Sequence, residues 1–184
     1  MWEQSIAETI NQKEYPATKV ACFERVSFEE FKNAFKSCGY GNELEARDAY
    51  TAIKIPVRKT RKSAGHDISI PFSLRLSPGE KTLIPTGLRC GIREDYVMLI
   101  FPRSSLGIKR GMKISNTIPV IDADYFEADN EGHIFISIEN LSNKDIILEK
   151  GDSFVQALFF SYGIAVGSGS STRRKGGIGS TDEP

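Results

Sequence analysis

Residues 96–125 read YVMLIFPRSSLGIKRGMKISNTIPVIDADY, an apolar run followed by a polar segment that ends in an acidic cluster. The apolar run, Tyr96–Phe101, predicts a strand. Near the far end, Asp122 follows the apolar pair Val120-Ile121. A carboxylate held at the end of a strand can orient and deprotonate a water molecule. The stretch therefore predicts two strand segments with a candidate general base at the end of the second.

The polar middle of this stretch offers groups that bind phosphate and a nucleobase. Arg103 carries a planar fork of donors suited to phosphate, and the hydroxyls of Ser104 and Ser105 can add short hydrogen bonds. Asn116 has both a donor and an acceptor, as reading a base edge requires. For any one of these residues alone, a plain polar loop is the favoured interpretation. Together with Asp122, a phosphate-binding group, a base reader and a candidate general base fit within about twenty-five residues.

Outward from this stretch, the chain from residue 51 onward has a period of two and turn-like punctuation. Ser77–Glu80 (SPGE) and Glu149–Asp152 (EKGD) predict turns. Many short strands without helices between them indicate a sandwich or barrel of the jelly-roll kind, an all-β class. Besides Tyr96–Phe101, the segments predicted as strands are Ile53–Val57, Leu74–Leu76, His133–Ile138 and Ile146–Leu148.

Residues 1–50 differ from the rest and predict an N-terminal extension with one amphipathic helix. Ser27 and Glu30 form a capping-box pattern, with Ser27 as N-cap and Glu30 reaching back. Phenylalanines at i, i+3 and i+7 give one apolar stripe, and Gly39 supplies a stop. A helix of about eleven residues is too short to be stable alone, so we expect it to pack on the main domain rather than serve a dedicated partner.

Composition excludes some classes of function. The 184 residues carry 24 Lys+Arg and 24 Asp+Glu, so net charge points to neither nucleic acid nor membrane. No apolar run is long enough to span a bilayer and no signal peptide is evident. Cys22, Cys38 and Cys90 have no metal spacing, which indicates reduced thiols and a cytoplasmic protein. His66 and His133 are far apart, and we interpret neither as a metal ligand.

Five short segments, in order, resemble the five motifs of the trimeric dUTP pyrophosphatase (dUTPase) family. The resemblance covers residues from about 51 to 184. The matching segments are Ala64–Ile68, Pro102–Gly107, Asn116 with Val120–Tyr125, Gly151-Asp152 with Gln156, and Arg173 with Gly176–Thr181.

The resemblance implies a distorted jelly-roll barrel and hydrolysis of dUTP to dUMP and pyrophosphate. In that family a water attacks the α-phosphorus while Mg²⁺ is bound to the triphosphate. The reaction limits uracil incorporation into DNA and supplies dUMP for thymidylate synthesis. Family members are homotrimers whose sites draw motifs from different subunits, so the resemblance implies that this chain needs its neighbours to be active.

Site roles follow from the same resemblance. Asp122 would activate the water, and Tyr125 would lie against the deoxyribose and exclude a 2′-hydroxyl. No direct metal ligand is expected, although Asp67 could act through water. The uracil readers would be Asn116, Val120 and Ile121, and the phosphate ligands Arg103, Ser104, Ser105 and Gln156.

The C-terminal segment, residues 163–184, is rich in Gly and Ser at first and predicts a flexible tail after a β domain of residues 51–162. Taken alone, a frayed end is the favoured interpretation. The resemblance implies instead a lid over bound nucleotide. The lid residues would be Arg173, Gly177, Ile178, Gly179, Ser180 and Thr181.

The sequence departs from the family pattern at several points. Pro119 stands where glycine is usual, which fixes φ and removes an N–H from the hairpin. Ser153 replaces an arginine, Ile178 an aromatic residue and Asp182 a glycine. The loop at residues 126–132 also exceeds the family's compact turn.

Two alternatives remain open at the level of sequence. The related dCTP deaminases share a fold and an Arg-Ser-Ser motif, and Glu139 on a predicted strand could be assigned as a deaminating acid. A second alternative is a dUTPase-like module that mainly binds a regulatory protein partner through its N-terminal helix.

Overall fold

Strand β7 (Tyr96–Pro102) lies inside the largest sheet of the protein, whose strand order is β2-β3-β12-β7-β9. The structure, a computed structural model, describes residues 18–167, 169, 176 and 177. β12 (Ser153–Ser161) pairs antiparallel with β7, from Val155 opposite Pro102 to Ser161 opposite Tyr96. Met98 and Ile100 of β7 point inward and are fully buried, which confirms the predicted strand.

Three smaller sheets complete the β domain in the described part of the chain. β10 (Phe135–Asn140) alternates buried and partly exposed residues, the pattern of a strand with one face on the core. The orders are β5-β10-β8, β11-β4 and β1-β6. Their strands are β1 (Ala21–Arg25), β4 (Leu74–Leu76), β5 (Lys81–Pro85), β6 (Leu88–Ile92), β8 (Met112–Ile114) and β11 (Ile146–Leu148); the large sheet also holds β2 (Val57–Arg58), β3 (His66–Ser69) and β9 (Val120–Ile121).

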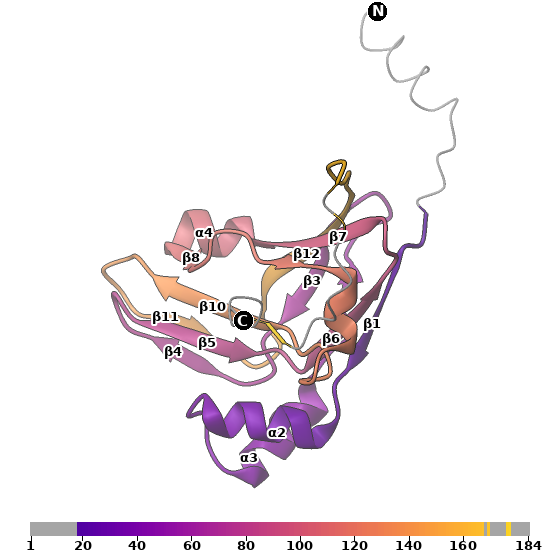
Figure 1. Ribbon diagram of the computed structural model, residues 1–184. Coiled ribbons are helices and arrows are strands. Elements are labelled where there is room, and N and C mark those ends of the chain that lie inside the picture. Colours follow the sequence, from indigo (N-terminus) through magenta and orange to yellow (C-terminus); the bar gives the residue numbers. More distant parts are fainter. Residues whose placement is uncertain (1–17, 168, 170–175, 178–184) are drawn as a thin grey trace, which may run out of the picture.

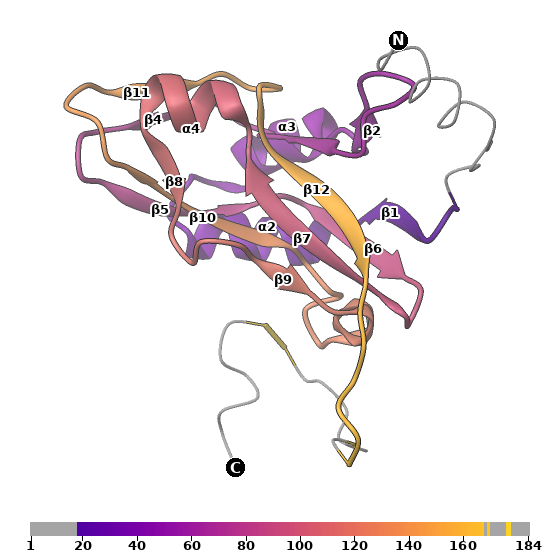
Figure 2. The ribbon, with the colours of Figure 1, turned by 90° about the horizontal axis from the view of Figure 1, so that it is seen from above.

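These sheets face one another in two layers, which confirms the all-β expectation of a jelly-roll kind (Figure 1). Helix α4 (Ser104–Arg110) lies on the outer side of one layer, and α2 (Phe28–Ser37) and α3 (Glu43–Ala52) lie together beneath the other. Seen from above, β7 and β12 cross the molecule between α4 at one end and the end of β9 at the other (Figure 2). Among the described residues, no helix is long and apolar enough to cross a membrane.

Helix α2 confirms the predicted amphipathic helix in its position and packing. Ser27 is the N-cap, and its hydroxyl accepts a hydrogen bond from the Glu30 N–H at 3.2 Å. Phe31 and Phe35 are buried in the same core cluster as the strands. Gly39, with φ of +81°, follows the helix end. The helix packs on the β domain, as expected from its apolar stripe.

The structure differs from the sequence expectations in the rest of this region. A second helix, α3, runs across residue 50, and strand β1 pairs with β6, so residues 21–52 pack on the β domain as one strand and two helices. The predicted strand Ile53–Val57 is reduced to β2 because α3 extends to Ala52, Ile53 is buried at its end, and Pro56 has no N–H to donate.

Two further details of the prediction are wrong. β10 begins at Phe135 rather than at His133, because the His133 N–H bonds to the Asn130 carbonyl in a turn. The Glu30 carboxylate does not reach back to Ser27. Instead, the Ser27 N–H donates to Glu131 at 2.7 Å, so the cap of α2 is completed from a distant loop.

Candidate active site

Strand β9 holds Asp122 at the edge of the five-stranded sheet. Ile121 lies opposite Met98 of β7, and Asp122 follows immediately, before the 3-10 helix η1 (Ala123–Glu127). The Asp122 carbonyl accepts the Tyr125 N–H at 3.2 Å, which fixes the start of η1. The side chain is partly buried. A carboxylate held between a strand end and a helix start has the geometry of a positioned base.

Asp122 lines a cavity of about 630 Å³, which we call the acidic cavity. Its wall comes from the ends of β6, β9 and β12 and from η1. The carboxylates in it would repel one another in the absence of a cation or hydrogen-bond donors. The lining residues are Gly91, Ile92, Glu94, Asp122, Ala123, Asp124, Phe126, Glu127 and Tyr162.

Tyr125 belongs to η1, whose other residues line this cavity, and is 6% exposed. Its hydroxyl donates to the His133 carbonyl at 2.6 Å and accepts from the Asn130 side-chain amide at 2.8 Å. Gly177 lies against the ring, since a Cβ there would be 2.9 Å from the Tyr125 hydroxyl oxygen. The phenol is therefore held in one position by partners from two directions.

The hairpin between β8 and β9 carries the expected uracil readers. Asn116 and Val120 are exposed at its tip and edge, respectively. Thr117 has φ of +68°, a left-handed conformation that lets the chain reverse. Pro119 is buried, and its carbonyl accepts the Ile100 N–H at 3.1 Å, so the proline keeps the hairpin attached to β7. The hairpin thus keeps its pairing despite the missing N–H.

A second cavity, of about 310 Å³, lies beside the start of α4, and we call it the basic cavity. Arg103 precedes α4, and the exposed Ser104 and Ser105 form the first turn. Gly111, with φ of +71°, ends the helix. The cavity is lined by Lys59, Arg103, Ser105, Leu106, Arg110, Leu148, Gly151, Asp152 and Ser153.

Ion pairs orient the cations of the basic cavity. Asp67 on β3 lies 3.6 Å from the Arg103 guanidinium and 3.3 Å from the Lys59 ammonium. The Arg103 side chain also donates to the Ser153 carbonyl at 3.5 Å. Ser153, which stands where an arginine is usual, therefore still contacts the cavity through its backbone.

Gln156 is opposite Asp67 in the pairing of β12 with β3. The end of its side chain occupies the space where a Cβ on Gly65 would be, so Gln156 lies directly against the first matching segment. Asp67 Oδ2 is buried and accepts no hydrogen bond, although Lys59 lies near it. The first, second and fourth matching segments therefore meet around Asp67.

The structure separates the predicted site residues into two groups. The two cavities share no lining residue. Asp122 follows Ile121, which pairs with Met98, whereas Arg103 follows the other end of β7. At about 3.3 Å per residue, the two side chains originate about 20 Å apart along the strand. Of the predicted lid, only Gly177 is described; Arg173, Ile178, Gly179, Ser180 and Thr181 lie outside the described residues.

Residues that sequence reasoning missed lie in the loop before β10. His133 is fully buried, with Nδ1 3.0 Å from the Glu30 carboxylate of α2. Glu131 accepts from the Ser27 N–H and hydroxyl, and these bonds hold the pKa of its carboxyl below the usual value. Lys59, outside that loop, lies in the basic run Arg58–Lys62, a pattern typical of a solvated loop. No local signal predicts the first two contacts, because the partners are more than one hundred residues apart.

Comparisons with known proteins converge on one family. The family model described as dUTPase matches residues 51–182. A deoxyuridine 5′-triphosphate nucleotidohydrolase of Lactococcus lactis is 38% identical over 144 residues, covering 77% of this chain and 96% of the relative. The crystal structure of a dUTPase from Streptococcus mutans aligns with a TM-score of 0.61 at 29% identity, covering 79% of this chain and 98% of the other. A dUTPase from phage phi11 of S. aureus, at 18% identity and TM-score 0.60, covers 84% and 97% and shares the fold.

Proposed function

This chain belongs to the dUTPase family and hydrolyses dUTP, and we propose that Asp122 is the base that starts the reaction. The observation that carries this assignment is the place of Asp122, directly after β9 on the wall of the acidic cavity. The stretch that contains it lies inside the matched residues 51–182. A base must lie within hydrogen-bond reach of the proton that it accepts, and a carboxylate held at a strand end meets that demand.

The reaction proceeds by attack of one water molecule on the α-phosphorus of dUTP. Asp122 accepts a proton from the water while the water oxygen forms a bond to the α-phosphorus. The bond from that phosphorus to the bridging oxygen of the β-phosphate breaks. The products are dUMP and pyrophosphate. Donors around the phosphates stabilise the charge that develops on the leaving group.

Nucleobase and sugar are read on the acidic side of the site. The exposed Asn116 and the backbone of Val120 and Ile121 hydrogen-bond the uracil edge. A slot with fixed donors and acceptors rejects cytosine strongly, because mismatched polar groups would remain unpaired. Tyr125 lies against the deoxyribose, and its fixed ring leaves no room for a 2′-hydroxyl. Two hydrogen bonds to the phenol support this role, because discrimination by shape requires a ring that cannot move away.

The phosphates lie on the basic side, held by Arg103, Ser104, Ser105 and Gln156. Lys59, which lines the same cavity, adds a positive charge. Mg²⁺ bound to the triphosphate would neutralise part of its charge. The residues fit such an ion through water: Asp67 Oδ2 is buried, lies 3.3 Å from the Lys59 ammonium without a hydrogen bond, and could accept one from a metal-bound water molecule.

Separation of the two halves supports a site shared between subunits of a homotrimer. One triphosphate has its α-phosphorus and its outer phosphates only a few ångströms apart, whereas Asp122 and Arg103 originate about 20 Å apart along β7. One subunit therefore supplies Asp122 and Tyr125, and a neighbour supplies Arg103. The tail then covers the nucleotide, with Arg173, Gly177, Ile178, Gly179, Ser180 and Thr181 as its contacts. A lid of this kind excludes water and completes the site.

Subunit complementation tests both the residues and their sharing. Asp122→Asn and Arg103→Ala, each with at most about a tenth of the parental activity when dUTP is well below the parental KM, are unfolded together in equal amounts and refolded. If sites are shared, every mixed trimer has one intact site, and random mixing restores about one quarter of the parental activity. Each variant refolded with itself is the control. Failure of the mixture to exceed its controls, with mixed trimers verified by mass, would show that each site lies within one chain.

The two alternatives are not favoured by the comparisons, whose matching relatives are named for dUTP hydrolysis. Glu139, the candidate deaminating acid, lies on β10 opposite Lys81 and Lys113 and lines neither cavity of the site. The assay is direct: Mg²⁺ with dUTP should give pyrophosphate, and dCTP should give no ammonia. The regulatory alternative assigned the N-terminal helix to a partner, but its apolar face packs on this chain's own core.

A further inference from the structure

The loop of residues 128–133, between η1 and β10, is fastened to the N-terminal helix α2 at two points. Near the start of α2, the Ser27 N–H and hydroxyl donate to Glu131 at 2.7 and 2.6 Å. Within the first turn of α2, the Glu30 carboxylate lies 3.0 Å from His133 Nδ1. The family model begins at residue 51, so α2 lies outside the matched region.

The protonation of His133 follows from its partners. Its Nε2 accepts the Gly87 N–H at 2.9 Å, so that nitrogen carries a lone pair. The proton of the neutral ring is then on Nδ1, which donates to Glu30. The ring is 0% exposed and lies 4.3 Å from the Phe135 ring and 6.2 Å from the Phe31 ring, between centroids. Hydrogen bonds at both ring nitrogens and contacts with two aromatic rings therefore fix the position of the His133 ring.

The backbone of His133 links the position of its ring to the position of Tyr125. The Tyr125 hydroxyl donates to the His133 carbonyl at 2.6 Å. Gly132, with φ of +70°, comes so close to η1 that a Cβ there would lie 2.7 Å from the Tyr125 carbonyl. The residues from Glu30 through His133 to Tyr125 therefore form one hydrogen-bonded chain from α2 to the phenol.

We propose that Glu30 is a positioning residue for Tyr125 and acts through His133, so that helix α2 takes part in rejecting ribonucleotides. The inference rests on the proposed role of Tyr125 against the sugar. Without the Glu30 carboxylate, His133 Nδ1 would be a buried donor without its partner, a state that favours displacement of the ring. The His133 carbonyl would move with it, and the phenol would lose its fixed place. A displacement of a few tenths of an ångström suffices to admit a 2′-hydroxyl.

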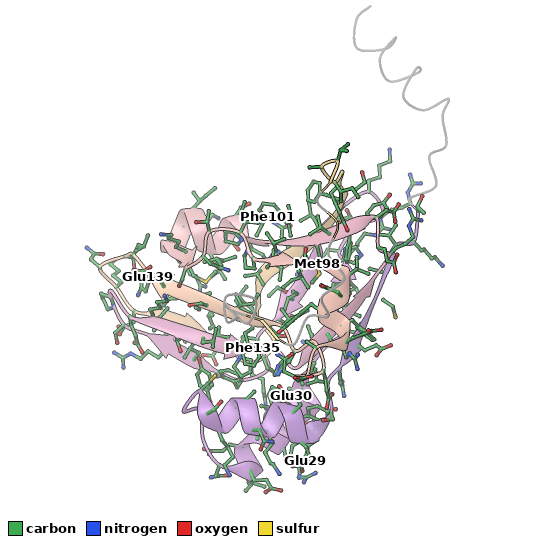
Figure 3. The ribbon with its side chains drawn as sticks, in the orientation of Figure 1. Glu29, Glu30, Met98, Phe101, Phe135 and Glu139 are labelled. Atoms are coloured by element: carbon green, nitrogen blue, oxygen red, sulfur yellow. The ribbon has the colours of Figure 1, made fainter. Side chains whose placement is uncertain are left out.

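Helix α2 offers a matched control in the preceding residue. Glu29 is also in the first turn and carries the same charge, but its side chain is 70% exposed and pairs with Lys32 on the same helix. The Glu30 side chain is 22% exposed and faces the β domain. Figure 3 shows Glu30 directed toward the sheet above it and Glu29 at the outer side of the helix.

The test is the ratio of kcat/KM for dUTP to that for UTP, measured well below the melting temperature of each variant. We expect Glu30→Ala to lower the ratio about tenfold, Glu29→Ala to leave it unchanged, and Glu30→Gln, which keeps an acceptor for Nδ1–H, to retain most of it. If Glu30→Ala does not fold, Glu30→Asp, whose carboxylate is one methylene too short, takes its place with the same criterion. A general loss of stability would lower both rates together and leave the ratio unchanged.

Tyr125→Phe, which removes only the hydroxyl, closes the test. In the double variant with Glu30→Ala the two effects should not add, because both break the same chain of hydrogen bonds. An unchanged ratio for Glu30→Ala, with a lowered ratio for Tyr125→Ala, would overturn the positioning role while leaving the sugar role of Tyr125 intact. An unchanged ratio for Tyr125→Ala would overturn the sugar role itself.

Discussion

The two halves of the site are fastened to the protein in different ways. Tyr125, on η1 at the acidic half, is buried, and its hydroxyl is hydrogen-bonded to the loop that α2 holds in place. Arg103, beside the basic cavity, is partly exposed and oriented mainly by a 3.6 Å ion pair with Asp67. Buried hydrogen bonds fix geometry closely, whereas a 3.6 Å ion pair whose guanidinium is 31% exposed leaves the cation more freedom to move.

This contrast fits the chemistry that we propose for each half. Choosing deoxyribose over ribose depends on a single oxygen atom, so it needs a rigid surface. Holding a triphosphate needs positive charge and several donors, and flexible cations can adapt to it. Substitutions far from the nucleotide should therefore lower the sugar selectivity of the acidic half. Phosphate binding by the basic half should change only when its own side chains are substituted.

The largest expected effect belongs to the base itself. Asp122→Asn keeps the shape of the side chain but cannot accept a proton, so kcat should fall by a factor of about 10² to 10⁴ while nucleotide still binds. Single-turnover rates and calorimetric binding of dUTP measure the two quantities separately. A variant that keeps most of its turnover number would remove Asp122 from the role of base.

A distant substitution next tests whether the acidic half depends on the interior. Phe31 of α2 is fully buried beside His133, and Phe31→Ala should lower the free energy of unfolding by about 3–5 kcal/mol. Selectivity for dUTP over UTP should fall as well, because the cavity lets His133 move. Phe28→Ala is the control, since Phe28 is only partly buried and contacts the edge of Tyr50. Chemical denaturation and kinetics on both nucleotides measure these two effects. If Phe31→Ala and Phe28→Ala behaved alike, the dependence of the acidic half on the interior would be contradicted.

A substitution in the basic half should weaken nucleotide binding and leave the sugar preference unchanged. Arg103→Ala should raise KM for dUTP by about 10- to 100-fold, as expected for lost charge-assisted hydrogen bonds, with little change in the preference over UTP. Arg103→Lys should recover part of the loss, because it restores the charge but not the planar fork. Lys59→Ala, whose side chain is 58% exposed, should have the smaller effect. A changed sugar preference in Arg103→Ala would mean that the halves are not independent.

Much of this arrangement could be predicted from the sequence, but some parts of it could not be predicted. The α2 stripe of Phe31 and Phe35 and the cap at Ser27 are local signals, and the helix was found. Helix α3 was missed because its buried face consists of Ala46 and Ala49, which give little apolar contrast. Its Asn42–Glu45 capping box was a signal that could have revealed it.

The candidate site divides in the same way. Motif order predicted site roles for Asp122 and Arg103, because each motif is a few adjacent residues. Their separation onto two cavities depends on strand register, which the sequence does not reveal. The contact between Glu30 and His133 joins positions 103 residues apart and could not be inferred from a capping-box pattern that pointed elsewhere.

The smallest predicted effect concerns the second fastening of the loop, between Ser27 and Glu131. Hydrogen bonds from the Ser27 hydroxyl and N–H lower the pKa of the Glu131 carboxyl from its ordinary value of 4.5. A lowered folded-state pKa means that the ionised carboxylate stabilises the fold above the unfolded pKa, and that this contribution disappears as pH falls through the folded-state pKa. Glu131→Gln should therefore reduce the melting temperature by about 2 °C at neutral pH.

The pH dependence distinguishes this fastening from a general effect of charge. The difference in melting temperature between parent and Glu131→Gln should shrink below pH 4.5. The parent carboxyl then becomes protonated, so it is neutral like the glutamine amide. Glu24→Gln, on an exposed position of β1, should change the melting temperature less at neutral pH. A Glu131→Gln difference that stayed constant from pH 7 down to the acid transition would mean that the carboxylate's charge does not hold the loop. In that case the acidic half would depend on α2 through the contact between Glu30 and His133 alone.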